Sequence, residues 1–173
     1  MTRGPGGGQM TEPLSQSAAR FQEAIAGLGF AGRVVQLEAT TRTARDAAQA
    51  IGCGVEQICK SLVFRGKLSG EPVLVIASGV NRVDEDLIGE IVAESVGMAQ
   101  ADYVRERSGY AIGGVPPFGH PVRLRTIVDA DLLQYPTVWA AAGHPRAVFE
   151  LTPTDLVRVS EGQVTAVCPP REA

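Results

Sequence analysis

Hydrophobic residues recur every three or four positions near the start of the chain, at positions 14, 18, 21, 25 and 28. This spacing predicts an amphipathic helix, with Thr11 as its N-cap and Gly29 as its C-terminal stop. Other helices are predicted where a capping residue precedes a mixed run of apolar and polar residues. They are expected after Thr43, Asp84 and Thr152 and over residues 101–107, with a short helical turn at 55–59.

Shorter apolar runs predict strands. The expected strands are residues 34–37, 61–65, 73–77, 122–128, 138–142, 147–151 and, as an edge strand, 164–167. Glycines and a proline between the second and third runs predict a hairpin. Because helices and strands are interspersed without regular βαβ alternation, we expect one α/β domain with a mixed sheet over residues 13–170. The glycine-rich residues 1–12 are predicted to be a flexible tail.

Length and composition favour a single globular domain over a dedicated nucleic-acid binder or a membrane protein. The chain has 173 residues, of which 45% are hydrophobic, and a net charge of −3. This size supports one domain with its own core, whereas a dedicated nucleic-acid binder is usually basic. There is no apolar run of transmembrane length, and we expect neither a transmembrane helix nor a signal peptide. Cys53, Cys59 and Cys168 form no CxxC pair and are expected to be reduced thiols, so we expect a cytoplasmic protein.

The segment 109–119 is the most distinctive stretch, with four glycines, two consecutive prolines and almost no polar side chains. Such a loop can offer its backbone N–H groups to a carbonyl oxygen or oxyanion, although it can also be only a tight connection. Lys60 lies just before an apolar run. A lysine in this place can be partly desolvated and can point its ammonium at an anion. A solvated lysine remains the alternative. Ser61 adds a hydroxyl that either serves the site or bonds to the backbone.

Several common kinds of site are excluded because the sequence lacks the motifs that mark them. The glycine-rich loop is neither GxGxxG nor a P-loop, and no GxSxG elbow or HExxH motif is present. No metal site and no cofactor are expected, because neither His120 nor His144 has cysteines at a ligand spacing. Both histidines are expected to be structural or solvent-facing. His144 is the more interesting, since the small residues 141–143 beside it leave room for a ligand.

Taken together, these segments resemble the YbaK/ProX family, the free-standing relatives of the editing domain inserted into bacterial prolyl-tRNA synthetases. The resemblance covers roughly residues 14 to 168. It rests on segments that occur in the expected order, namely 43–52, 57–64, 77–84, 109–119 and 142–143.

The resemblance implies an α/β fold in which helices surround a curved, barrel-like mixed sheet. It also implies that Lys60 is essential and engages the 3′-terminal nucleotide of a tRNA, with Ser61 beside it. The family's GxxxP loop, which holds the aminoacyl carbonyl, falls on Gly113, Gly114, Val115, Pro116 and Pro117. Ala142 and Gly143 are expected to line the pocket, and His144 is added from its place beside them.

The expected activity is trans-editing, the hydrolysis of the ester that joins a wrong, small amino acid to a tRNA. Such an ester is already activated, so positioning, an oxyanion donor and an ordered water can suffice without a catalytic triad. Alanine, serine, threonine and cysteine all remain open as substrates. The expected partner is the tRNA acceptor end, delivered with or without a synthetase or elongation factor, and neither DNA nor a membrane. The alternatives are a non-catalytic tRNA-end or synthetase-binding module and a small-molecule binding protein that uses the same cleft.

Overall fold

The computed structural model describes residues 13–30, 32–38 and 41–170, so the predicted tail and Thr11 lie outside the described residues. Eight strands within these ranges form one mixed sheet in the order β1-β7-β6-β2-β3-β5-β8, with β4 attached to β2. The strands are β1 (Val34–Gln36), β2 (Ile58–Gly66), β3 (Pro72–Ser78), β4 (Val96–Met98), β5 (Arg125–Asp129), β6 (Val138–Ala141), β7 (Ala147–Leu151) and β8 (Gln163–Thr165). The predicted α/β class with a mixed sheet is confirmed.

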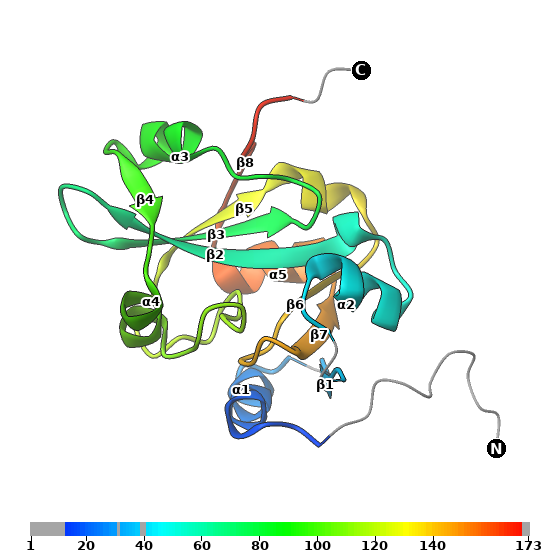
Figure 1. Cartoon of the computed structure of the whole chain (residues 1–173). Helices are drawn as coiled ribbons and strands as arrows, with labels where there is room; N and C mark the ends of the chain where they lie inside the picture. Colours follow the sequence, from blue (N-terminus) through cyan, green and yellow to red (C-terminus); the bar gives the residue numbers. More distant parts are fainter. Residues whose placement is uncertain (1–12, 31, 39–40, 171–173) are drawn as a thin grey trace, which may run out of the picture.

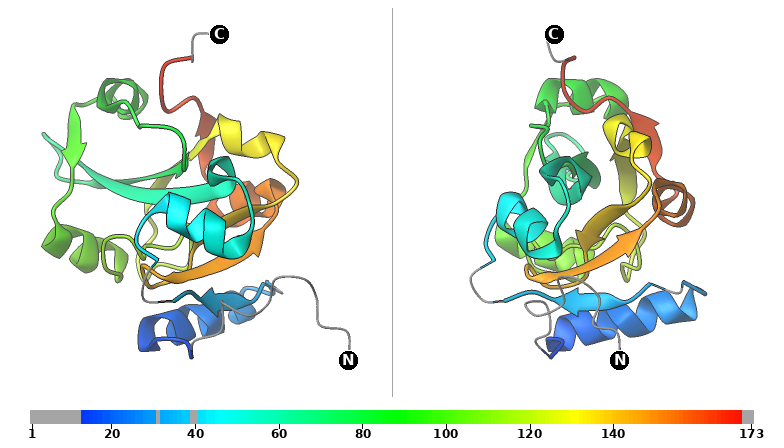
Figure 2. Two further views of the ribbon diagram at one scale, coloured as in Figure 1. Left: turned by 45° about the vertical axis from the view of Figure 1, so that its right-hand side comes forward. Right: turned by 90° about the vertical axis from the view of Figure 1, so that its right-hand side faces the viewer.

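Helices lie around this sheet, with α3 and α1 on opposite sides of the β2–β3 hairpin (Figures 1 and 2). The helices are α1 (Gln16–Gly27), α2 (Ala44–Ile51), α3 (Glu85–Val92), α4 (Ala101–Ser108) and α5 (Pro153–Ser160), with short 3-10 turns η2 (Val55–Gln57) and η3 (Ala130–Gln134). The predicted caps Thr43, Asp84 and Thr152 each accept a backbone N–H of the first helical turn. No helix in the described part of the chain combines the length and apolar character needed to cross a bilayer.

Several boundaries differ from the sequence prediction. Strand β2 begins at Ile58 rather than at residue 61, so Lys60 lies within the strand and not just before it. The N-cap of α1 is Ser15, whose side chain accepts the Ala18 N–H, so the helix begins later than expected. Strand β5 begins at Arg125 rather than at residue 122, because its pairing with β3 begins there. The short strand β4 and the turn η3 were not predicted at all. The predicted edge strand is confirmed as β8, which lies at one end of the strand order and is shifted to Gln163–Thr165.

A cluster of aromatic rings fixes the glycine- and proline-rich loop to the rest of the fold. Phe118 of the loop lies 6.2 Å from the Phe21 ring of α1 and 5.8 Å from the Phe149 ring of β7, centroid to centroid. Tyr110, at the start of the loop, meets the Phe21 ring edge-on at 6.5 Å. Offset and edge-to-face contacts of this kind are favourable beyond the area they bury. The loop is therefore anchored by core side chains at both of its ends.

Strand β2 is paired along only part of one edge. It pairs with β6 over Ile58 and Cys59 and with β4 over Phe64–Gly66, and these two strands lie toward opposite ends of β2 (Figure 1). No described strand pairs with residues 60–63 on that side, although the Ala99 N–H donates to the Val63 carbonyl at 3.0 Å. The other edge pairs with β3 throughout. The sheet therefore contains a gap beside the predicted Lys60–Ser61 pair.

Candidate active site

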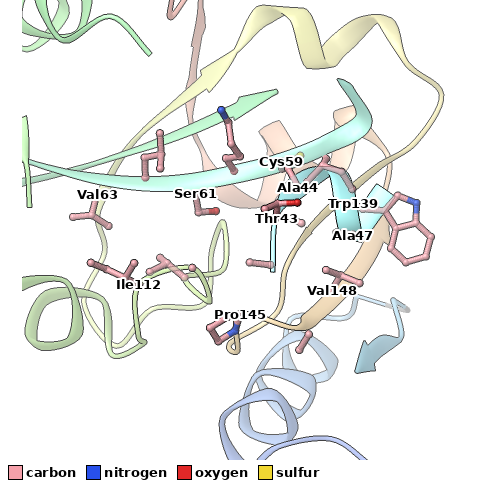
Figure 3. A pocket seen from close by; sticks show the side chains of 18 of the residues that line it. Thr43, Ala44, Ala47, Cys59, Ser61, Val63, Ile112, Trp139, Pro145 and Val148 are labelled. Carbon is pink, nitrogen blue, oxygen red and sulfur yellow. The ribbon is translucent and has the colours of Figure 1, made fainter. Parts of the chain in front are cut away.

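A cavity of about 290 Å³ opens at this gap. Its walls come from β2, β6, β7, the start of α2 and the glycine-rich loop, and Figure 3 shows Ser61, Val63, Ile112, Pro145 and Val148 directed toward the same space. Most of the lining side chains are apolar. Ligand sites are typically apolar hollows with a few convergent polar groups, and this cavity has that character.

Lys60 contributes to the cavity wall but directs its ammonium elsewhere. Side chains alternate along a strand, so Lys60 lies on the face opposite Cys59 and Ser61. Its Nζ donates to the Asn81 carbonyl at 2.6 Å. An ammonium has three donors, and within the described residues no other acceptor takes the remaining two. Burial lowers the pKa of Lys60, while Asp129 and Cys168 act in the opposite direction.

A buried polar network fixes the loop that carries Asn81. The Asn81 side-chain amide donates to Asp129 Oδ2 at 2.8 Å and to Asp131 Oδ2 at 2.7 Å. Asp129, which is 1% exposed, also accepts the Ser78 N–H at 3.0 Å. Because buried groups with satisfied hydrogen bonds are rigid, the carbonyl that holds Lys60 has a fixed position.

Two residues of the loop that line the cavity have backbone N–H groups without an acceptor among the described residues. Both Gly113 and Val115 line it, and Gly113 has φ +85°, a left-handed conformation that favours glycine. The Gly114 N–H donates to the Ala111 carbonyl at 2.9 Å, and the two prolines that follow have no N–H. Among the described residues, nothing accepts the N–H groups of Gly113 and Val115. These two donors can therefore receive a carbonyl oxygen or an oxyanion.

The other predicted binding residues stand behind the cavity rather than in its wall. Those that do not line it are Gly114, Pro116, Pro117, Ala142, Gly143 and His144. A Cβ added to Gly114 would come within 2.8 Å of the His144 backbone, and the Gly143 N–H donates to the Gly114 carbonyl at 2.9 Å. This close backbone contact holds the loop in place. The wall on this side is made instead by Ala140, Ala141, Pro145 and Ala147.

The imidazole of His144 is occupied by structural contacts. Its Nδ1 accepts the Arg146 N–H at 3.1 Å and lies 3.3 Å from the Gln36 side-chain amide. A ring nitrogen that accepts a backbone N–H carries no proton, so the neutral ring is protonated on Nε2. Burial, and then the charge of Arg146, lower the pKa of His144. These contacts support a role in holding the 142–147 turn.

The second histidine, His120, supports the loop in a way that the sequence did not indicate. Its Nε2 donates to the Pro116 carbonyl at 2.6 Å, since a carbonyl can only accept. Burial lowers the pKa of His120, and the bond to Pro116 opposes this only in part. The neutral ring is thus the form that the fold favours, and its bond to the Pro116 carbonyl holds this part of the loop.

We expect His120 to make the fold sensitive to mild acid. Its folded pKa lies below its ordinary value of 6.5. Its contribution to the free energy of unfolding is therefore complete above pH 6.5 and is lost as the pH falls from there through the lowered pKa. His120→Gln retains an amide donor but does not titrate. Between pH 7.5 and 5.0 the Tm of the wild type should fall by more than that of the variant.

The variant His144→Gln is measured alongside, because burial also lowers the pKa of His144. It separates the contribution of His144 to the fall in Tm from that of His120. The carboxylates with lowered pKa values, Asp46 and Glu94, titrate at more acidic pH and do not contribute in this range. If the Tm falls by the same amount in His120→Gln and in the wild type between pH 7.5 and 5.0, protonation of His120 is not linked to unfolding.

Nucleophilic and metal chemistry find no support in the described residues. Cys59 is buried, and burial, followed by the charge of Asp129, raises the pKa of its thiol far above its ordinary value. A thiol that stays protonated is a poor nucleophile. No group of three or more His, Cys, Asp or Glu side chains in residues 13–30, 32–38 and 41–170 is placed to hold a metal ion.

Most of the cavity wall was not predicted from the sequence. Thr43 was predicted only as a helix cap and Trp139 only as part of a strand, yet both line the cavity (Figure 3). The small residues Ala44 and Ala47 of α2 leave space on one side of it. Small side chains along the first turns of a capped helix are the one sequence signal that could have pointed to this wall.

A family model described as an aminoacyl-tRNA editing domain matches residues 38–159. The protein YwhH of Bacillus subtilis (strain 168), whose name assigns it no activity, is 32% identical over 131 residues, covering 76% of this chain and 83% of YwhH. EbsC of Enterococcus faecalis (strain ATCC 700802 / V583), named as a proposed Cys-tRNA(Pro)/Cys-tRNA(Cys) deacylase, is 25% identical over 126 residues. That match covers 72% of this chain and 76% of EbsC.

Solved structures show the same architecture. A protein described as a proposed trans-editing enzyme for prolyl tRNA synthetase superposes with a TM-score of 0.87 at 46% identity, over 91% of this chain and 100% of its own. The protein APE2540, described as hypothetical, superposes with a TM-score of 0.77 at 30% identity, over 84% of this chain and 97% of its own.

Proposed function

Because the chain belongs to the aminoacyl-tRNA editing domain family, we propose that it is a deacylase acting in trans on tRNA mischarged with a small amino acid. The observation that carries the proposal is the cavity at the gap in β2. It combines two backbone donors, at Gly113 and Val115, with a lysine that has two donors to spare on the adjoining face.

The proposed reaction is the hydrolysis of one ester bond. The aminoacyl group enters the cavity, and its carbonyl oxygen accepts the N–H groups of Gly113 and Val115. Water adds to the carbonyl carbon, the bond to the ribose oxygen breaks, and that oxygen takes a proton as the amino acid leaves. Preorganised donors stabilise the oxyanion that forms on the way, so no nucleophilic side chain is required.

Lys60 serves the nucleotide part of the substrate in this proposal. Its ammonium is held at the Asn81 carbonyl, and a phosphate or ribose oxygen of the terminal nucleotide can accept its other donors. Charge-assisted bonds of this kind position a substrate strongly. The net charge of −3 provides little general attraction to tRNA, so delivery by a synthetase or an elongation factor is part of the proposal.

A panel of tRNAs charged with alanine, serine, threonine, cysteine or proline, and one charged with phenylalanine, tests the proposal. We expect at least one small aminoacyl ester to be hydrolysed at least about tenfold faster than without protein, and the phenylalanyl ester tests whether the activity is confined to small side chains. Cysteine is included because EbsC is named for it. Binding of the charged tRNA end without any hydrolysis would favour the non-catalytic module, and ligand binding indifferent to tRNA would favour the small-molecule binder.

A further inference from the structure

The hydroxyl of Ser61 is buried without a hydrogen-bond partner in the described structure. Ser61 lies on the same face of β2 as Cys59 and Val63, and its oxygen points into the cavity (Figure 3). Polar groups that are buried in a native protein are nearly always satisfied, and an exception calls for an explanation. A ligand in the cavity would provide the missing partner.

The surroundings of this hydroxyl are largely apolar. Val63, Ile112, Pro145 and Val148 enclose the same space (Figure 3). The nearby hydroxyl of Thr43 already accepts the Asp46 N–H at 3.1 Å as the cap of α2. Ser61 is therefore the one side chain of the described wall whose buried oxygen is left entirely unpaired.

The main chain of Ser61 faces the cavity as well. The Val63 carbonyl points to the gap side of β2, where it accepts the Ala99 N–H, and backbone groups alternate along a strand. Hence the N–H and carbonyl of Ser61 also point into the gap. The α-ammonium, which every aminoacyl group has in common, can donate to this carbonyl. The hydroxyl then remains for the part of the substrate that varies, its side chain.

Size alone cannot separate the smallest amino acids in this cavity. A volume of about 290 Å³ is far larger than a side chain of one or two carbons. One methyl group more or less changes binding only modestly in an apolar pocket, whereas a site that hydrogen-bonds a substrate hydroxyl rejects the analogue without it much more strongly. Discrimination among small side chains must therefore come from the polar group.

Resting on the proposed function, we propose that Ser61 selects aminoacyl groups with a β-hydroxyl, serine and threonine, over alanine and cysteine. The substrate hydroxyl pairs with Ser61 Oγ inside the apolar wall. Alanine would leave Oγ unpaired against a methyl group. A thiol is a weak donor and a weak acceptor, so cysteine pairs poorly.

Single-turnover hydrolysis of one tRNA body charged with serine, threonine, alanine or cysteine tests this assignment. The wild type should hydrolyse the seryl and threonyl esters at least about tenfold faster than the alanyl and cysteinyl esters, which corresponds to about 1.4 kcal/mol in the barrier. Ser61→Ala should lower the seryl rate about tenfold and leave the alanyl rate within about threefold. Ser61→Thr, which retains the hydroxyl, should preserve the preference.

Val63→Ala is the matched control, since Val63 lies on the same face of β2 and lines the cavity without a polar atom. It should change the seryl and alanyl rates by a similar factor. Equal wild-type rates on the seryl and alanyl esters would overturn the assignment. So would an equal loss on all four esters in Ser61→Ala, because the hydroxyl would then contact the shared part of the substrate. No hydrolysis of any ester by the wild type would instead overturn the proposed function, and the selectivity with it.

Discussion

Replacing Lys60 with alanine is expected to slow deacylation at least about tenfold, or about 1.4 kcal/mol in the barrier. The ammonium is fixed at 2.6 Å from the Asn81 carbonyl, and its two other donors are the ones assigned here to the terminal nucleotide. The alanine variant retains strand β2 and loses only a half-buried side chain, so its Tm should stay close to that of the wild type. Single-turnover rates at saturating and subsaturating protein separate a loss of binding from a loss in the chemical step.

Lys67→Ala is the control for this prediction. Lys67 is the only other lysine of the chain, it is exposed beside the β2–β3 turn, and its removal changes the net charge by the same amount. It should leave the rate within about twofold. Equal rates for the wild type and both variants would show that Lys60 has no part in the reaction.

Adding a side chain at Gly114 is expected to have the largest effect on the site. A Cβ there would lie 2.8 Å from three backbone atoms of His144, so the loop or the 142–147 turn must move. Backbone cannot yield as a flexible side chain can, and overpacking of this kind costs about 1–3 kcal/mol of stability. Gly114→Ala should lower the Tm, and Gly114→Val should lower the deacylation rate about a hundredfold at a temperature where it is still folded.

The physical reason is packing behind the cavity wall. Gly114 lies against the His144 backbone, so an added side chain there disturbs the loop and does not meet the substrate carbonyl directly. The neighbouring loop residue Val115 does not provide a neutral control for Gly114, because its side chain is 1% exposed and part of the core.

Gly27→Ala is the better comparison, because a Cβ at Gly27 meets nothing within 4 Å. It should leave both rate and Tm nearly unchanged. If Gly114→Ala behaves in the same way as Gly27→Ala, the loop has no tight contact with the 142–147 turn.

The elements that sequence predicts well are those fixed by neighbouring residues. Thr43 and Asp46 form the predicted capping box, and Asp84 and Thr152 begin helices as their positions indicate. Strand β4 could not be predicted in this way. Its three residues include a glycine, and what makes it a strand is pairing with Phe64–Gly66 of β2, 30 to 34 positions away.

The candidate site likewise contains residues that the sequence predicts and features that depend on long-range contacts. Lys60, Ser61, Gly113 and Val115 were all predicted from the sequence and all contribute to the cavity wall. The gap between β4 and β6, which makes the cavity possible, depends on long-range strand pairing that no local pattern encodes. For the same reason, the contact of Gly114 with His144 and the bond from His120 to Pro116 become visible only in three dimensions.

The most direct measurement is a crystal structure with a stable substrate analogue. This analogue is 3′-amino-3′-deoxyadenosine acylated with serine, in which an amide replaces the ester bond. We expect the seryl group to lie in the cavity beside Ser61, with its carbonyl oxygen at the N–H groups of Gly113 and Val115. The adenosine should then lie toward Lys60. A seryl group bound on the other face of β2, in the hollow lined by Phe64 and Arg82, with the cavity left empty, would contradict it.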